Sequence, residues 1–342
     1  MLVTYHVDQI LHNPKVCFWR GKFIAQPDRA ERYRILFSSV QREGHDLIAV
    51  EDEDTNPIFA VHDSAYVSFL ETAWERWQLL SASGGSADVV PSVHIPRRVR
   101  RKPQGFVAEL GWFSNSASCV IEKDTWKSVR GSAYAAIAAA KAVAQSGSVA
   151  YALCRPSGHH AYPDMMSGMC YLNNAGIGAG VLASHFGKVA ILDIDIHHGD
   201  GTQFMFYDRP DILYSSLHAD PRIAAPYFSG FVDECGEGAG VGTNFNFVLP
   251  PGTDDAGYLE VLDRALNEIR RFGAEAVVVS VGLDASEHDP MSIFSLSNLC
   301  FFEMGRRIDA LRLPTLLVQE GGYVSKELGN CLLAFLGGFS SN

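Results

Sequence analysis

The stretch Ala190-Ile-Leu-Asp-Ile-Asp-Ile-His-His-Gly-Asp-Gly201 starts as a buried strand and then turns polar. Its apolar side chains recur at every second residue, so they share one face of an extended chain, while Asp193, Asp195 and His197 share the other. Burying three ionisable groups together is costly unless something pairs with them. A divalent metal ion meets this need, because carboxylates and imidazoles are ordinary zinc ligands. The apolar residues at the start favour a covered strand over a solvated strand end, so we predict a metal site.

Short apolar runs alternate with amphipathic segments along the rest of the chain. The runs that we predict as buried strands lie at 149–154, 188–196, 212–217, 276–281 and 315–318. Helices are predicted at 28–43, 65–80, 131–145 and 258–269. Buried strands that alternate with helices are typical of an α/β fold in which a central parallel β-sheet carries helices on both faces.

The length of 342 residues is compatible with one large core, and no long linker, charge block or repeat divides the chain. We therefore predict a single domain over residues 1–342. Residues 81–105 are rich in Ser, Gly and Pro and contain the basic run Arg97-Arg-Val-Arg-Arg-Lys102, so we predict a solvated insertion loop there. A basic surface for an acidic partner or a second subunit is the alternative.

Composition and charge narrow the range of functions. The net charge of −11 argues against nucleic-acid binding and favours cationic ligands. No apolar run is long enough to span a membrane, and the N-terminus lacks the pattern of a signal peptide. Seven cysteines without a Cys-x-x-Cys pair indicate reduced thiols. We therefore expect a cytoplasmic protein that binds neither nucleic acid nor membranes.

Polar motifs follow four of the predicted strands. They begin at Arg155, His197, Gly282 and Gln319. In a parallel sheet, ligands bind beyond the carboxyl ends of the strands, so we expect these motifs to meet at one rim. The predicted metal ligands are Asp195, His197 and Asp284. Three protein ligands leave a coordination position open for water and substrate, as a catalytic metal requires.

Two neighbouring histidines and two spare carboxylates indicate acid–base chemistry. His159 and His160 follow a strand, although adjacent histidines alone often form only a polar turn. Asp193 and Asp200 are not needed as ligands, and a carboxylate that accepts the Nδ1 proton raises the basicity of an imidazole. We predict two His–Asp pairs that act as general base and electrostatic helper. Tyr323 follows Gly-Gly, which alone indicates a turn, and at this rim its phenol would donate to an oxyanion.

Together these motifs resemble the zinc-dependent histone deacetylase superfamily of the arginase–deacetylase fold. Within that superfamily the chain looks most like the bacterial acetylpolyamine amidohydrolases, and the resemblance runs along nearly its whole length. It rests on the motifs at 155–161, 168–174, 193–202, 282–284, 289–290 and 320–323.

The resemblance implies a role for each of these residues. Zn²⁺, or Fe²⁺ in the cell, would be held by Asp195, His197 and Asp284. His160 would be the general base and later the general acid, with Asp200 as its carboxylate partner. His159 with Asp193 would give electrostatic support. The phenol of Tyr323 would polarise the acetyl carbonyl. A structural K⁺ is implied at Asp193, Asp195, His197, Ser216 and Leu217. A second monovalent site is implied at Phe206, Arg209, Ile212 and Thr243.

The implied reaction is hydrolysis of small cationic acetylated amines, namely acetylputrescine, acetylcadaverine and acetylspermidine. Gly168, Met169 and Tyr323 are implied to contact the substrate. The insertion at 81–105 looks like the segment through which polyamine-specific relatives dimerise and narrow the active-site mouth. We therefore expect a homodimer and a small-molecule substrate.

Departures from the family pattern concern the pocket. Ser157 replaces a proline, and Met169 and Ala225 stand where many relatives have aromatic walls of the acyl-lysine tunnel. Compensating aromatic side chains would come from Tyr227 or Phe228. Some relatives select polyamines with acidic residues at the mouth, and the candidate positions for these are Cys17 and Glu109.

Three other functions remain open. A protein or peptide lysine deacetylase uses the same catalytic residues and differs only in its mouth and quaternary structure. A ureohydrolase of the same fold would need extra carboxylates for a two-metal centre, and Asp284 is not followed by a second Asp two residues on. A non-catalytic, metal-dependent acyl-amine binding module would lack part of the machinery, whereas His159, His160 and Tyr323 are all present.

Overall fold

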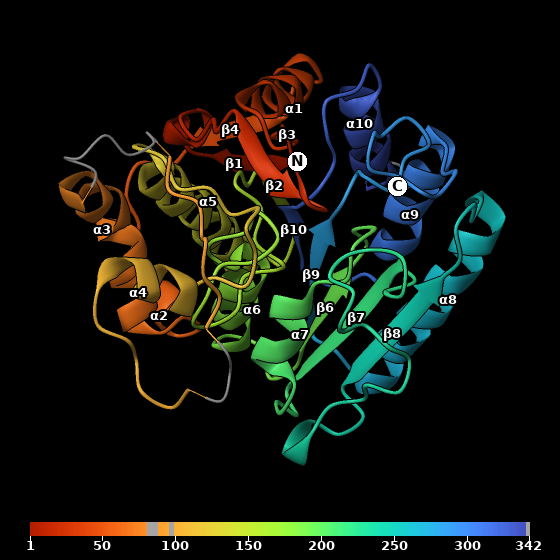
Figure 1. Cartoon of the computed structure of the whole chain (residues 1–342). Helices are drawn as coiled ribbons and strands as arrows, with labels where there is room; N and C mark the ends of the chain where they lie inside the picture. The colour runs from red at the N-terminus through yellow and green to blue at the C-terminus, as the bar shows by residue number, and fades with distance from the viewer. Residues whose placement is uncertain (81–87, 96–98, 340–342) are drawn as a thin grey trace.

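The computed structural model describes residues 1–80, 88–95 and 99–339, and an eight-stranded sheet forms its centre (Figure 1). The strands of this sheet pair in parallel. Across the sheet they follow the order β4 (Asp46–Ala49), β1 (Leu2–Tyr5), β5 (Val149–Ala152), β10 (Thr315–Gln319), β9 (Ala276–Val281), β6 (Val189–Asp193), β7 (Ile212–Ala219) and β8 (Asn244–Leu249). A separate antiparallel hairpin pairs β2 (Val16–Trp19) with β3 (Lys22–Ala25). The predicted α/β fold with a central parallel sheet is confirmed.

Helices cover both faces of the sheet, and neighbouring strand residues such as Ile191 and Leu192 alternate between two cores. One core is completed by α1 (Ala30–Arg42), α8 (Asp255–Phe272), α9 (Asn298–Asp309) and α10 (Leu328–Gly338). The other is completed by α5 (Thr125–Ser146), α6 (Asn174–Ala183) and α7 (Asp200–Phe206). Because β6 and β9 are buried along their whole length, they need apolar residues on both faces.

The chain between β4 and β5 builds a further layer on the outer side of α5. It contains α2 (Asn56–Phe59), α3 (Ser64–Leu80) and α4 (Phe106–Trp112). The ring centroid of Phe69 lies 5.9 Å from that of Phe106 and 4.9 Å from that of Phe113, so aromatic side chains of α3 form core. Within the predicted insertion, 81–87 and 96–98 lie outside the described residues. The described residues 88–95 and 99–105 form no helix or strand.

The strand predicted at 188–196 ends earlier, at Asp193, because carboxylates bind the backbone N–H groups beyond it. The N–H of Asp195 donates to Asp193 Oδ1 at 3.1 Å. The N–H of Ile196 donates to Asp284 Oδ1 at 3.2 Å, and that of His197 to Asp195 Oδ1 at 2.9 Å. Side chains that bond backbone N–H groups compete with a sheet ladder. The expectation that three ionisable groups share one strand face is therefore wrong for Asp195 and His197, which lie in the loop after β6.

Helix ends follow the sequence signals more closely. Gly147 after α5 and Gly273 after α8 have φ of +68° and +74°, the left-handed conformation that favours glycine at a helix C-terminus. Asp124 directly precedes α5, and its side chain makes no capping hydrogen bond. Two 3₁₀ helices, η1 (Val7–Ile10) and η3 (Gly238–Gly240), complete the helical elements of the described chain. Among the described helices, none has the length and apolar character that a membrane crossing requires.

Helices α9 and α10 pack so closely that a methyl group on Gly305 would lie 2.2 Å from the carbonyl oxygen of Phe335. We expect Gly305→Ala to lower the free energy of unfolding by roughly 1–3 kcal/mol, the usual cost of overpacking. Gly337→Ala is the matched control, because a methyl group there would first meet the Phe302 ring at 3.8 Å. Denaturant titration followed by circular dichroism measures both changes. Equal stability of the Gly305 variant and the wild type would contradict this account of the packing.

Candidate active site

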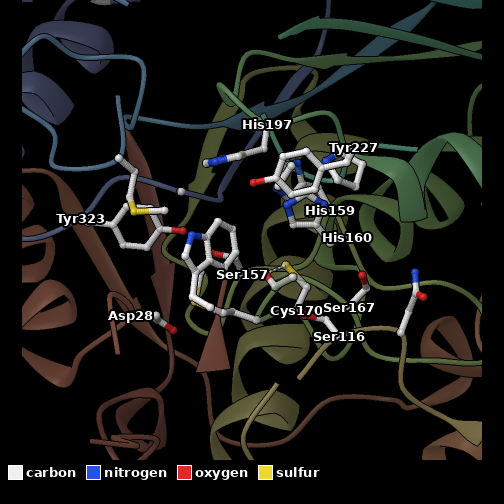
Figure 2. Close-up of a pocket in the computed structure, with 18 of the residues that line it drawn as sticks. Asp28, Ser116, Ser157, His159, His160, Ser167, Cys170, His197, Tyr227 and Tyr323 are labelled. Carbon is white, nitrogen blue, oxygen red and sulfur yellow. Dashed lines mark hydrogen bonds between the residues drawn. The ribbon is translucent and has the colours of Figure 1, made fainter. Parts of the chain in front are cut away.

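The four polar motifs meet in one pocket beyond the carboxyl ends of β5, β10, β9 and β6 (Figure 2). These four strands are neighbours in the sheet although they are far apart in the sequence. His160, His197 and Tyr323 come from three of the motifs and line the pocket. The fourth motif supplies Asp284, whose Oδ2 contacts His197 Nδ1. The predicted convergence of the motifs at one rim is therefore observed.

The three predicted metal ligands form a compact group. Ligand atoms of Asp195, His197 and Asp284 all lie within 4.8 Å of one another. His197 Nδ1 is 3.2 Å from Asp195 Oδ1 and 3.2 Å from Asp284 Oδ2. Both carboxylates are buried, while His197 is partly exposed at the pocket. Two carboxylates and one imidazole are a donor set that suits a catalytic zinc ion with an open coordination position.

Electrostatics and close packing both favour a cation at this group. Burial and the neighbouring Asp195 carboxylate raise the pKa of Asp284 above its ordinary value, because two buried negative charges repel each other. A methyl group on Gly321 would lie 2.2 Å from Asp284 Oδ2 and 2.4 Å from Asp195 Oδ2. Glycine therefore keeps the space beside both carboxylates free. The Gly321 N–H donates to Asp195 Oδ2 at 2.8 Å and orients that carboxylate.

Both predicted His–Asp pairs are formed. His160 Nδ1 lies 2.6 Å from Asp200 Oδ1, and His159 Nδ1 lies 3.1 Å from Asp193 Oδ2. When each carboxylate accepts the Nδ1 proton, Nε2 of the ring is left to accept another proton. Asp193 Oδ2 also accepts a hydrogen bond from the Tyr214 hydroxyl at 3.0 Å, a contact that the sequence motifs do not indicate.

The environments of the two histidines push their pKa values apart. Burial and the adjacent His159 lower the pKa of His160, against the opposing effect of Asp200. Burial alone would lower the pKa of His159, but the carboxylates of Asp195 and Asp193 outweigh it and raise that pKa well above its ordinary value. His160 is therefore suited to accept a proton, whereas His159 is suited to carry positive charge.

Tyr323 points into the pocket from the side opposite the two histidines, as Figure 2 shows. Its backbone N–H donates to Asp289 Oδ2 at 2.6 Å, and Gly322 before it has a φ of +111°. The guanidinium carbon of Arg32 lies 5.7 Å from the centre of the Tyr323 ring. Burial and the carboxylates of Asp284 and Asp195 raise the pKa of Tyr323 well above its ordinary value, so the phenol keeps its proton as a donor.

Glu320 is a buried residue of the site to which sequence reasoning assigned no role. Its Oε2 accepts hydrogen bonds from the N–H groups of Gly158 and His159, at 2.7 and 3.1 Å. It therefore fixes the turn that presents both histidines. Burial raises the pKa of Glu320 to about 7. One carboxylate oxygen of Glu320 also lies within 4.8 Å of a ring nitrogen of His159 and of the sulfur of Cys170. The only sequence signal was a carboxylate directly after a fully buried strand.

The residues of both implied K⁺ sites are neighbours, while the identity of any bound ion stays a prediction. For the first site, Asp193 on β6 is the register partner of Ser216 on β7, next to Leu217. For the second site, three hydrogen bonds involve Phe206, Arg209 and Thr243. The Arg209 N–H donates to the Phe206 carbonyl at 3.1 Å, and Thr243 Oγ1 donates to the Arg209 carbonyl at 3.2 Å. The Thr243 carbonyl accepts from the Tyr214 N–H at 2.8 Å, and Ile212 begins β7.

The pocket wall contains the predicted substrate residues. Gly168 and Met169 line it, and a methyl group on Gly168 would lie 2.3 Å from a ring carbon of His160. Tyr227 and Phe228 line the wall together with Ala225, where we expected compensating aromatic rings.

The two candidate positions for acidic residues at the mouth do not contribute to the described pocket lining. Cys17 is buried in the β2–β3 hairpin, and Glu109 forms ion pairs with Arg76 and Lys102. Neither of them is among the described residues that line the pocket. The carboxylate of Glu109 already pairs with Arg76 and Lys102 of the same layer, so its charge is balanced there.

Comparisons with known proteins agree with this fold and with this site. The family model "Histone deacetylase domain" matches residues 26–339. An acetylpolyamine amidohydrolase of Burkholderia pseudomallei is 40% identical over 341 residues, covering 100% of this chain and 99% of the relative. Acetylpolyamine amidohydrolase 2 of Pseudomonas aeruginosa is 39% identical over 342 residues and covers 99% of this chain and 98% of the relative. The crystal structure of an acetylpolyamine aminohydrolase from Burkholderia pseudomallei superimposes with a TM-score of 0.96 at 40% identity, covering 100% of this chain and 99% of that one. The chain therefore belongs to the histone deacetylase domain family.

Proposed function

We propose that this protein is a zinc-dependent amidohydrolase that removes the acetyl group from acetylated polyamines and small acetylated diamines. The observation that carries the proposal is the single pocket that holds the His160–Asp200 pair, the Asp195–His197–Asp284 group and Tyr323. Full-length relatives named acetylpolyamine amidohydrolases, at 38–40% identity, support the substrate class. The proposal includes structural K⁺, a cytoplasmic location and a homodimer through residues 81–105, part of which lies outside the described residues.

Asp195, His197 and Asp284 would hold the zinc ion. When bound, a divalent cation supplies Lewis-acid polarisation of a carbonyl and lowers the pKa of water. His160 Nε2 accepts the proton of the attacking water, while the Nδ1–H bonded to Asp200 keeps the ring in the required tautomer. His159, held in its charged form beside Asp193, offsets the negative charge that develops next to it.

Tyr323 stabilises the acetyl oxygen as the tetrahedral intermediate forms. Its hydroxyl donates a hydrogen bond to that oxygen, and the bond strengthens as negative charge develops there. His160 then donates its proton to the amide nitrogen, the C–N bond breaks, and acetate and the free amine leave. The same imidazole thus serves as base and acid.

The pocket suits a slender cationic amine. Aromatic residues of its wall include Trp19, Tyr227 and Phe228. Aromatic ring faces attract ammonium groups, and the net charge of −11 favours the approach of cations. A protein lysine deacetylase would use the same catalytic residues, so the substrate decides between the two functions.

We expect acetylputrescine, acetylcadaverine and acetylspermidine to be deacetylated faster than an acetyl-lysine peptide at equal concentration. The physical reason is that a mouth narrowed by the proposed homodimer would admit a free amine chain and exclude a peptide backbone. Acetate release by the zinc-loaded protein measures all four substrates. Faster turnover of the peptide would reassign the protein to the lysine deacetylases.

Replacing Tyr323 by Phe removes one donor to the developing oxyanion and should lower kcat by roughly 10²–10³-fold. Binding of acetylputrescine, measured by calorimetry, should remain within about threefold of wild type, because the ring and its packing are retained. Undiminished acetate release by this variant would show that Tyr323 does not act on the reacting carbonyl.

His160→Ala should lower kcat by at least about 10²-fold, because the general base is lost, and should leave the metal content near that of wild type. His197→Ala is the matched comparison and should lose the metal, because a ligand is removed. Elemental analysis after gel filtration measures zinc in both variants. Extensive zinc loss from the His160 variant would mean that the ligand and the base are assigned wrongly.

A further inference from the structure

The turn of the β2–β3 hairpin holds an arginine in an unusual backbone conformation. Arg20 and Gly21 link the two strands with φ values of +46° and +79°. A two-residue hairpin turn with positive φ at both positions strongly favours Asn, Asp or Gly at the first of them. An arginine in this place is disfavoured by local sterics, so its retention calls for a reason outside the hairpin.

The Arg20 side chain reaches across the mouth to a second residue with positive φ. Its Nε and Nη2 atoms donate to the Tyr227 hydroxyl oxygen at 2.9 and 2.8 Å, and Tyr227 has a φ of +74°. Met169, in the pocket wall, has a φ of +66°. Met169 and Tyr227 line the reaction pocket and Arg20 contacts Tyr227, so three of the four non-glycine residues with positive φ in the described chain lie at or beside that pocket. Such strained residues concentrate at sites that bind or convert ligands.

Arg20 lines a second pocket next to the reaction pocket. This side pocket is lined by Arg20, Ile196, Pro290 and Ile293 among others. It shares five lining residues with the reaction pocket, and these are Trp19, His197, Ala225, Tyr227 and Met291. One of the shared residues is the predicted metal ligand His197. The two pockets are therefore adjacent, with Arg20 in the lining of the second one.

The charge of Arg20 is not neutralised within the part of the chain that the structure describes. No carboxylate there lies within 4.0 Å of its guanidinium, and its hydrogen bonds go to the Tyr227 hydroxyl and, at 3.3 Å, to the Ile223 carbonyl. A planar guanidinium fork normally binds the two oxygens of a carboxylate. Here a neutral phenol oxygen takes that place, and no hydrogen bond of Nη1 is observed among the described residues.

The reaction pocket offers no free carboxylate to an ammonium group. Asp28 is the only acidic residue among the described residues that line it. Its Oδ1 accepts from Arg155 Nε at 2.7 Å and from Arg32 Nη1 at 3.4 Å, so its charge is already balanced. An ammonium-ended substrate therefore relies on aromatic faces, whereas a carboxylate-ended one finds a cation with an unused hydrogen-bonding edge.

We propose that Arg20 forms a carboxylate subsite, and that the protein also deacetylates linear amides whose far end is a carboxylate, the N-acetylated ω-amino acids. This inference rests on the proposed amide hydrolysis in the same pocket. Water oxygen bonds to the acetyl carbon, the C–N bond breaks, and the nitrogen leaves with a proton, which yields acetate and the ω-amino acid. Arg20 binds the far carboxylate and takes no part in the proton transfers.

Three amides of similar length, which differ only at the far end, test the subsite. They are 4-acetamidobutanoate, N-butylacetamide and N-acetylputrescine, with carboxylate, methyl and ammonium ends. In the wild type we expect KM for 4-acetamidobutanoate to be lower than KM for N-butylacetamide. Arg20→Gln should raise the KM for 4-acetamidobutanoate, divided by the KM for N-butylacetamide, by about tenfold. This is the effect expected from losing one charge-assisted hydrogen-bonded pair.

Arg222→Gln is the matched control. Arg222 lies in the same loop as Tyr227, bears the same charge and pairs with Asp220, but it lines neither pocket. Its replacement should leave the KM ratio as in the wild type. A wild-type KM for the carboxylate-ended amide that exceeds the neutral one, or an equal effect of Arg20→Gln on all three substrates, would overturn the subsite.

The test also separates this inference from the proposed function. If N-acetylputrescine is hydrolysed and 4-acetamidobutanoate is not, only the carboxylate subsite fails. If no amide releases acetate, the hydrolase proposal fails, and calorimetric binding of 4-acetamidobutanoate and N-butylacetamide still decides on Arg20. Binding that is about tenfold tighter for the carboxylate, and is lost in Arg20→Gln, supports the subsite, whereas equal binding of the two amides rejects it.

Discussion

The site depends on one constraint, which is that several carboxylates are buried beside each other at the ends of covered strands. Isolated buried charges are costly, so each carboxylate must find donors. Backbone N–H groups supply many of them: Ile196 donates to Asp284, Gly321 to Asp195, and Gly158 to Glu320. The backbone thus leaves regular strand pairing where the chemistry begins, and the polar groups of the loops hold the acidic side chains in fixed orientations.

This arrangement also assigns different roles to identical side chains. His159 and His160 are sequence neighbours with ring centroids 4.0 Å apart, and each binds a carboxylate. The carboxylates of Asp195 and Asp193 raise the pKa of His159. The pKa of His160 is raised by its partner Asp200 but lowered more strongly by burial and by the neighbouring His159. The pKa of His159 is therefore raised and that of His160 is lowered, a separation that suits the two residues to different roles in acid–base chemistry.

Reactivity and substrate choice reside in different parts of the fold. The predicted catalytic residues follow strands of the buried sheet, whose packing holds them in place. The mouth is built from the β2–β3 hairpin, the loop containing Tyr227 and the segment containing Met169. Changes in these loops would therefore leave the strand ends undisturbed.

The sequence by itself was sufficient to predict the parallel α/β fold and the convergence of the candidate metal ligands, the two His–Asp pairs and Tyr323. Each of these is a local motif that directly follows an apolar run. The same stretch of sequence therefore indicates both the strand and the polar residues at its end. The tertiary structure decided three other features. Strand β6 ends at Asp193, Glu320 binds the backbone of the histidine turn, and Glu109 pairs with two cations. The tertiary structure also decided the Arg20–Tyr227 contact, whose partners are 207 positions apart. Such contacts depend on which loops the sheet order brings together, and no local pattern of residues contains that information.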